Sequence, residues 1–307
     1  MKNISTLPIH RIGFALVAVL SLATAHAQLL VQDQFNYSAA DVVGDNGGTG
    51  WSGSWANPAS GGTAPWGTGG TMGNRKGDAP VVSPGATYSG LSTSGNALSP
   101  LNQSAYRSWN ASSLFTSAGS FWVSFLITPG ASAVNASMYV LPFAQNNATV
   151  APDYQKGSGA KFSAGADGST WTVTLNIPTA QNGSGYTTPA VRALTLNQAN
   201  LIVMEFNYNG SGTDTIQLWV NPTLGGAAPL GTDLSTTTGN GWMDQLGEFM
   251  VKNGATTVAT VDEINIGTTY SNVVSVPEPS TLALSLIGGF MGLVVFRWRA
   301  SAPNLRQ

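Results

Sequence analysis

Few side chains in this chain of 307 residues could carry out chemistry, because only 8% of its residues are charged and it contains no cysteine. Its two histidines are His10 and His26. The absence of cysteine excludes disulfides and thiol nucleophiles. The lack of histidine after residue 26 removes Ser-His-Asp triads and histidine zinc sites from the body of the chain. Carboxylates are therefore the candidate catalytic groups.

A pair of carboxylates on one face of a sheet would suit glycoside hydrolysis, which needs them about 5–10 Å apart. Glu205 is the only acid on the strongest predicted strand, residues 201–208, and Asn occupies positions 207 and 209. Asp262 and Glu263 are adjacent, so in a regular strand they point to opposite faces. We therefore predict a non-enzymatic domain in which Glu205 is a solvated or hydrogen-bonded sheet residue.

Two tryptophans are the candidates for carbohydrate binding. Trp122 alternates with an apolar stripe in residues 121–128, and Trp219 does so in residues 214–220. If the stripes face the core, both indoles lie on the opposite face, where they can stack on sugar rings. Two alternatives stay open: the indoles pack under a loop, or the two faces are reversed.

A structural calcium ion is a further expectation. Carboxylate and carbonyl oxygens hold Ca²⁺, and the candidate ligands are Asp33, Asp45 and Asp262. We expect no other cofactor.

The elements that must position these residues are short β-strands separated by turns rich in Gly and Asn. The expected strands are 28–35, two short ones within 88–108, 121–128, 138–143, 160–164, 171–177, 201–208, 214–220, 247–251 and 261–266. The tryptophans of the Gly-rich loop 44–55 can fold back onto the core, and residues 57–80 read as a surface loop. The pattern predicts an all-β, two-sheet antiparallel sandwich over residues 28–275.

The charge balance of the body excludes one class of partner. Residues 28–276 hold seven basic and thirteen acidic residues, so the formal charge of this region is −6. With no basic patch to neutralise phosphates, the composition argues against nucleic acid binding.

The N-terminal segment has the features of a secretory signal peptide. Lys2 and Arg11 precede an apolar core, residues 12–23, and Ala25-His26-Ala27 supplies the small residues that signal peptidase prefers. We expect residues 1–27 to form a signal helix that is cleaved after Ala27.

The C-terminal segment contains a second apolar run. Residues 281–296 carry no charge and are expected to form a transmembrane helix. Arg297 and Arg299 follow directly and place the C-terminus in the cytoplasm. The alternatives are an ordinary tail anchor or a buried core helix.

Residues 276–307 resemble a known sorting signal. The motif Pro277-Glu278-Pro279, the apolar run and the two arginines are similar to a PEP-CTERM sorting signal. The resemblance implies a bacterial protein whose tail is recognised and removed by an exosortase, a membrane transpeptidase. We expect a protein anchored in the inner membrane before sorting, which then reaches the cell envelope or the extracellular matrix.

The body of the chain also resembles a family. The segments 33–35 with 47–51, 218–222 and 262–269 are similar to those of exported proteins that pair a concanavalin A-like (LamG-type) jelly roll with a PEP-CTERM tail. The resemblance implies that the first and last strands lie side by side in one sheet, and it implies no substrate.

These observations together predict a surface module rather than an enzyme. We expect an exported, non-catalytic protein associated with exopolysaccharide, either adhesive or carbohydrate-binding. The alternative is a polysaccharide-active glycoside hydrolase with a diverged site. The expected partners are signal peptidase, exosortase, the membrane and a polysaccharide, but no nucleic acid.

Overall fold

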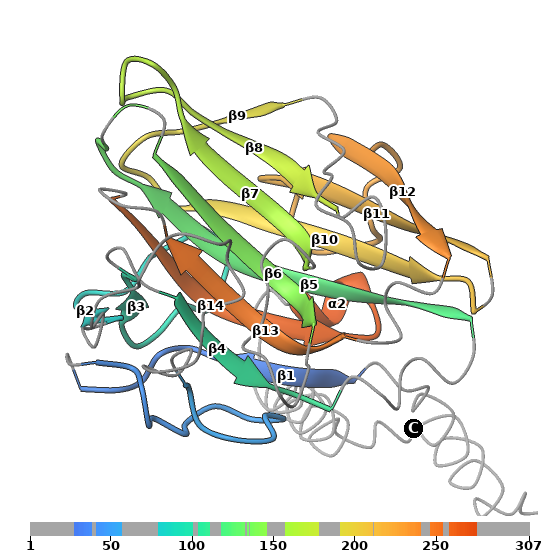
Figure 1. Ribbon diagram of the computed structural model, residues 1–307, viewed down its shortest axis with the longest axis horizontal. Helices are drawn as coiled ribbons and strands as arrows, with labels where there is room; N and C mark the ends of the chain where they lie inside the picture. Colours follow the sequence, from blue (N-terminus) through green and yellow to red (C-terminus); the bar gives the residue numbers. More distant parts are fainter. Residues whose placement is uncertain are drawn as a thin grey trace, which may run out of the picture.

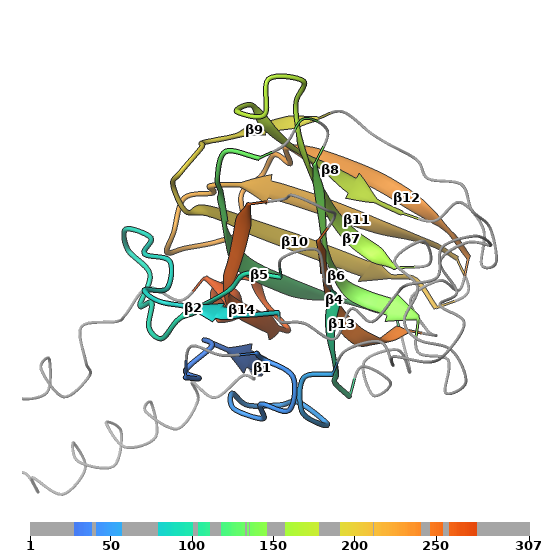
Figure 2. The ribbon, with the colours of Figure 1, turned by 60° about the vertical axis from the view of Figure 1, so that its left-hand side comes forward.

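In the part of the chain that the computed structural model describes, two antiparallel β-sheets lie face to face and one short helix accompanies them (Figure 1 and Figure 2). The structure describes residues 28–38, 41–56, 79–100, 104–110, 118–132, 134, 136–145, 157–177, 191–210, 212–240, 246–253 and 258–274. The prediction of an all-β, two-sheet domain is confirmed over these residues.

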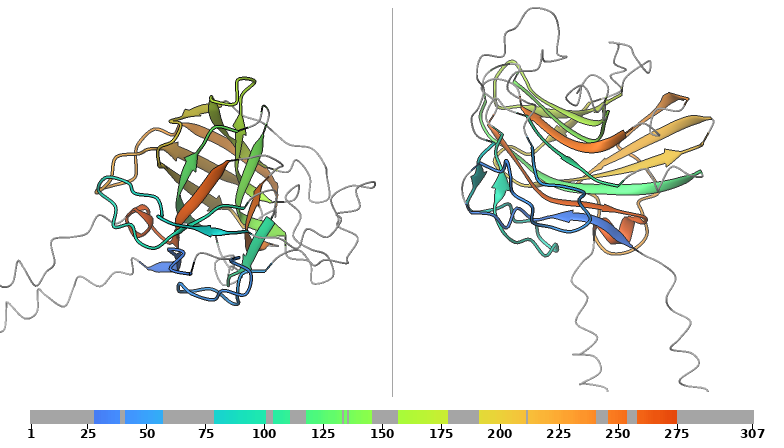
Figure 3. Two further views of the ribbon diagram at one scale, coloured as in Figure 1. Left: turned by 90° about the vertical axis from the view of Figure 1, so that its left-hand side faces the viewer. Right: turned by 60° about the horizontal axis from the view of Figure 1, so that its bottom comes forward.

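The larger sheet has eight strands. They are β1 (Leu29–Asp33), β2 (Val81–Val82), β3 (Ala97–Leu98), β5 (Gly119–Pro129), β10 (Asn200–Tyr208), β11 (Thr213–Val220), β12 (Leu234–Asn240) and β14 (Ala259–Gly267). Their order is β12-β11-β10-β5-β14-β3-β2, and β1 pairs antiparallel with β14 (Figure 3). The expected pairing of the first strand with the last is therefore confirmed.

The smaller sheet has six strands. They are β4 (Ser104–Ser108), β6 (Ser137–Gln145), β7 (Ser158–Ala164), β8 (Trp171–Asn176), β9 (Arg192–Leu194) and β13 (Leu246–Asn253), in the order β4-β13-β6-β7-β8-β9. The helix α2 (Tyr270–Val273) follows β14 and packs on the outer face of the eight-stranded sheet.

The core between the sheets is built from the apolar stripes seen in the sequence. Alternate residues of β5 and of β8 are buried in one cluster, and the intervening residues face outward. Phe125 of β5 meets Phe162 of β7 edge to face, with 6.1 Å between ring centroids. Each such ring stabilises the fold by about 1.5–3 kcal/mol through burial.

Residues 41–56 fold back onto one side of the sandwich, as the Gly-rich loop predicts. Trp55 is 1% exposed and stacks on Phe35 with 5.7 Å between ring centroids. Trp51 meets Phe249 of β13 edge to face at 5.9 Å. The two indoles therefore close the core at this side.

Several predicted segments lie outside the described residues. They are the signal helix 1–27, the transmembrane run 281–296, the sorting residues Pro277, Glu278 and Pro279, and the arginines Arg297 and Arg299. Within the described ranges, no helix is long and apolar enough to cross a bilayer.

Candidate functional site

Trp122 and Trp219 lie on the predicted outer face of the eight-stranded sheet but are covered there. They stack on each other with 5.3 Å between ring centroids, and Tyr270 of α2 meets Trp122 edge to face at 5.4 Å. Their exposed fractions are only 7% and 5%. This burial does not support the expectation that the two indoles stack on a sugar. It agrees with the alternative that they pack beneath other segments of the chain.

Glu205 stands alone as a carboxylate on its face of β10. Burial raises its pKa, and hydrogen bonds with the Asn207 and Ser120 side chains partly offset that rise. No second carboxylate is among the groups that shift its pKa. Its surroundings suit a hydrogen-bonded sheet residue, and among the described residues no carboxylate perturbs it as the second acid of a glycoside hydrolase pair would.

The expectation that Asp262 and Glu263 point to opposite faces is wrong. Val261 and Ile264 both enter the core, so the two acids between them lie on the outer side. The cause is a β-bulge in β14, where the register against β5 shifts after Asp262. Glu263 is the extra residue and has a φ of 51°. A bulge of this kind re-aims the side chain that it carries.

The two acids hold a loop against β14 and are closed to a substrate. Asp262 accepts a hydrogen bond from the Ala86 N–H (2.7 Å), and Glu263 accepts one from the Ser94 N–H (2.5 Å). Asp262 is fully buried and Glu263 is 4% exposed. Burial raises both pKa values, that of Asp262 to about 8.

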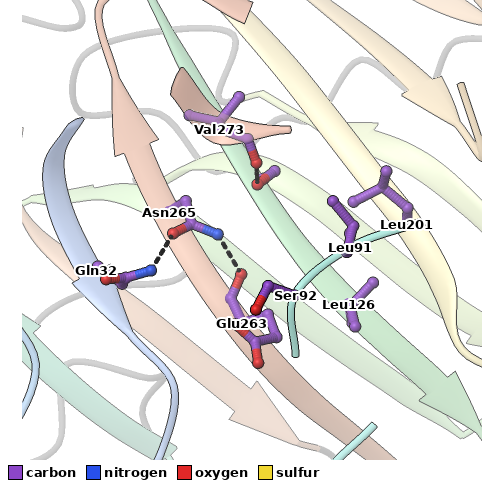
Figure 4. Close-up of a pocket in the computed structure, with 9 residues that line it drawn as sticks. Gln32, Leu91, Ser92, Leu126, Leu201, Glu263, Asn265 and Val273 are labelled. Carbon is purple, nitrogen blue, oxygen red and sulfur yellow. Dashed lines mark hydrogen bonds between the residues drawn. The ribbon is translucent and has the colours of Figure 1, made fainter. Parts of the chain in front are cut away.

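Beside this pair lies a small polar cavity (Figure 4). Its volume is about 40 Å³, and its lining includes Gln32, Glu263 and Asn265. Asn265 accepts a hydrogen bond from Gln32 (3.2 Å) and donates one to the Glu263 carbonyl (3.0 Å). The space suits about two or three water molecules and is too small for a sugar.

Two of the three calcium candidates are engaged by hydrogen-bond donors of the protein. Asp33 accepts hydrogen bonds from Arg107 and from the Tyr37 hydroxyl, both at 2.8 Å, and from an indole N–H. Asp262 accepts two backbone N–H groups. Among the described residues, no three acidic groups, Asp45 included, are placed to hold a metal ion.

The outer face of the six-stranded sheet is built differently. Leu141 of β6 and Met250 of β13 point away from the main core, yet both are fully buried. Tyr106 of β4 and Tyr139 of β6 pack against them and remain partly exposed. The result is an apolar floor flanked by two tyrosine rings that reach solvent.

A bulge in β6 produces this arrangement. The register between β6 and β7 shifts between Val140 and Phe143, so both of these side chains enter the core. Gly159 of β7 lies opposite the bulge, and a side chain there would come within 2.3 Å of the Val140 carbonyl oxygen. Glycine is therefore required for the close approach of β7 to β6.

A row of polar side chains crosses five strands next to the floor. The direct cross-strand neighbours are Ser104, Lys252, Tyr139, Lys161 and Thr174, in that order. Each lysine Nζ lies 5.8 Å from the centre of the Tyr139 ring. At about 4.8 Å per strand the row is roughly 19 Å long, enough for several sugar residues.

Glu248 of β13 completes the same face. It is 5% exposed, its Oε1 accepts a hydrogen bond from the Ser108 hydroxyl (2.8 Å), and its Oε2 has no partner among the described residues. Burial raises its pKa. The pKa of Tyr106 is also raised, first by burial and then by the Glu248 charge. We call Tyr106, Tyr139, Lys161, Glu248 and Lys252 the outer-face patch.

The sequence gives little sign of this patch. Tyr139 and Lys161 alternate with core residues in predicted strands, which places them on an outer face. Nothing local shows that Lys252 pairs beside Tyr139, because strands far apart in sequence meet there.

A wider hollow of about 600 Å³ opens on the outer side of the eight-stranded sheet. The described residues that line it are residues 84–89, Thr128, residues 197–199 and Thr260, and among these Tyr88 is the only aromatic residue and none is charged. Much of the lining is loop backbone, and this hollow lacks the combination of aromatic and charged groups found in the outer-face patch.

Comparison with known proteins identifies the tail. Residues 275–300 match the PEP-CTERM protein-sorting motif. The motif indicates a surface protein that is sorted by an exosortase. No curated protein sequence matches the chain.

Solved structures show only distant similarity. One is a conserved carbohydrate esterase from the Shiga toxin-encoding bacteriophage phi24B, with 13% identity over 80% of this chain and 100% of that chain, and a TM-score of 0.40. A protein of unknown function from Shewanella oneidensis MR-1 has 9% identity over 91% and 100% of the two chains, with a TM-score of 0.38. An endo-β-1,4-glucuronan lyase from the fungus Trichoderma reesei has 11% identity over 60% and 86%, with a TM-score of 0.35. At these identities and scores the similarities carry no argument about ligand or reaction.

Proposed function

We propose that this chain is an exported, non-catalytic surface protein whose β-sandwich binds carbohydrate through the outer-face patch. Signal peptidase removes residues 1–27, an exosortase processes the PEP-CTERM tail, and the sandwich remains in the cell envelope or extracellular matrix. The body has the arrangement of a concanavalin A-like jelly roll. The sorting motif and the pairing of β1 with β14 support these two parts of the proposal.

The observation that carries the binding proposal is the pair of tyrosines beside a dry floor. Tyr106 and Tyr139 present amphipathic rings, apolar over their faces and polar at the hydroxyl, next to the buried Leu141 and Met250. Sugars have apolar C–H faces and hydroxyl rims. Aromatic rings next to a few fixed polar groups are the usual composition of such sites.

Binding of the purified full chain, kept in detergent, to a panel of soluble polysaccharides tests this proposal. We expect Tyr139→Ala to lower the affinity for the bound polysaccharide about tenfold, because a ring contact of about 1.5 kcal/mol is lost. Tyr88→Ala is the matched control, since Tyr88 is a partly buried tyrosine on the outer side of the other sheet. If only the Tyr88 variant loses binding, the binding site lies in the hollow of about 600 Å³ that Tyr88 lines.

Processing is tested separately by the intact mass of the protein recovered from its producing cells. The mass is expected to lack residues 1–27 and part of the tail after Val276. A mass equal to the whole chain would overturn the sorting part of the proposal and leave the binding part untouched.

A polysaccharide-active enzyme is the second candidate function. The observation in its favour is Glu248, a buried carboxylate with raised pKa and one unpartnered oxygen, next to Tyr106. An assay for new reducing ends on the bound polysaccharide separates the two functions. Turnover that disappears in Glu248→Gln, with binding retained, would establish the enzyme in place of the binding module.

A further inference from the structure

The few cations of this acidic protein are unevenly placed. The described residues include four basic side chains, Arg107, Lys161, Arg192 and Lys252. Arg107 forms a buried ion pair with Asp33 (2.8 Å), and Arg192 pairs with Asp233 (2.9 Å). The other two both point at the Tyr139 ring, each with its Nζ 5.8 Å from the ring centre.

This convergence follows from the strand register. Lys252 of β13 and Lys161 of β7 flank Tyr139 of β6 as its direct neighbours on either side. From the two ring distances, the ammonium groups are at most about 12 Å apart. Screening by salt acts over about 8–10 Å, so the two charges act on the same small volume of solvent. An anion above Tyr139 is attracted by both lysines.

The patch also has a direction. Glu248 lies four residues before Lys252 on β13, a distance of about 13 Å along the strand. Its carboxylate is only 5% exposed, so the ligand does not contact it directly, but its negative charge disfavours a carboxylate at that end. The end of the patch at the two lysines therefore suits acid groups, and the end at Glu248 suits uncharged groups.

We propose that the ligand of the outer-face patch is an acidic polysaccharide, a polymer of uronic acids, whose carboxylates contact Lys161 and Lys252. This inference rests on the proposed function and names its substrate class. The Tyr139 and Tyr106 rings contact the sugar faces. Two lysines in a region of net charge −6 are too few for a nucleic acid, which requires a broad basic surface.

The test compares polygalacturonate with a neutral β-glucan in binding to the purified full chain in detergent. We expect tighter binding of polygalacturonate, weakened by added salt. Lys161→Gln and Lys252→Gln should each lower the affinity for polygalacturonate about tenfold, the usual effect of removing a charged hydrogen-bond partner. Arg192→Gln is the control, because it removes the same charge from an exposed ion pair on β9 of the same sheet.

Each other result has a distinct meaning. Equal binding of neutral and acidic polymers, lost in Tyr139→Ala and unaffected in both lysine variants, would overturn this inference and leave the proposed function intact. Equal binding of polyglutamate would show that charge alone is recognised and would overturn the assignment to a sugar acid. Absence of binding to all of the polysaccharides would overturn the proposed function and this inference together.

Discussion

At the scale of single residues, Arg107 fixes the N-terminal part of the fold. Its guanidinium contacts Asp33, the Gly47 carbonyl (2.8 Å) and the Gly53 carbonyl (2.7 Å), and it lies 4.8 Å from the centre of the Trp51 ring. Arginine and aspartate here are both 1% exposed. One side chain therefore neutralises a buried acid and ties the loop 41–56 to β4.

Removal of this guanidinium should be costly. Arg107→Met leaves the Asp33 carboxylate buried without a counter-charge, and we expect the free energy of unfolding to fall by about 3–5 kcal/mol. Arg192→Met breaks a largely exposed pair and should lower it by less than about 1 kcal/mol. Chemical denaturation of the full chain measures both values. Equal losses in the two variants would contradict the role assigned to Arg107.

At the scale of elements, the outer face of the eight-stranded sheet is a second small core. The Trp219 indole N–H donates a hydrogen bond to the Gly231 carbonyl, and the Tyr270 hydroxyl donates one to the Thr223 carbonyl (2.8 Å). These contacts fasten the loop after β11 and the helix α2 over Trp122. The indole pair thus joins these elements to the sheet.

This role leads to a prediction that separates stability from binding. Trp219→Ala should lower the free energy of unfolding by about 3–5 kcal/mol, because it removes a large buried ring. At a temperature where the variant is folded, its affinity for polysaccharide should equal that of the unchanged chain. Thermal unfolding and the binding assay used for Tyr139→Ala measure the two effects. Weaker binding by the folded variant would show that Trp219 contributes to polysaccharide binding.

Strand existence could be predicted from the sequence wherever one face is buried. The alternation in residues 121–128 and 171–177 correctly gave both the strands and the faces that enter the core. Strands β2, β9 and β12 were not predicted, and each lies at the end of its sheet. β12 has the sequence LSTTTGN, with one apolar residue, since an end strand has fewer neighbours to pack against. The short helix α2 was also missed.

The candidate site could not be predicted, because it depends on register. Tyr139, Lys161 and Lys252 belong to three strands, and only their pairing brings them together. Bulges add a second difficulty. One extra residue in a strand changes which face the following side chains point to, and Glu263 therefore lies on the same face as Asp262. Alternation alone predicts faces, and it cannot predict which side chains on a face are neighbours.

At the scale of the whole molecule, buried acids outnumber buried cations in the described residues. Asp262, Glu263 and Glu248 are at most 5% exposed, and burial raises the pKa of each. Each acid therefore binds its proton more tightly in the folded state than in the unfolded state. Where the unfolded state binds fewer protons, stability falls as pH rises. The chain should be more stable in mild acid than in mild base.

Asp262 gives this prediction a definite pH window. Its pKa is about 8 in the fold and 3.8 in the unfolded chain, so its contribution is fully present below about pH 4 and is lost as the pH rises through 8. Asp262→Asn removes this titration, and we expect a flatter plot of unfolding free energy against pH between 4 and 8. The readout is the slope, because the amide also changes hydrogen bonds at every pH.

Asp167→Asn is the matched control for this slope. Hydrogen bonds from Thr170 and Ser169 lower the pKa of the exposed Asp167, so its stabilisation is present above pH 4 and is lost in stronger acid. That substitution should leave the slope between pH 5 and 8 unchanged. If Asp262→Asn also leaves it unchanged, the carboxylate at the bulge is ionised in the folded protein at neutral pH. In that case the loop over β14 is held by a charged acceptor, and the predicted loss of stability between pH 4 and 8 does not originate there.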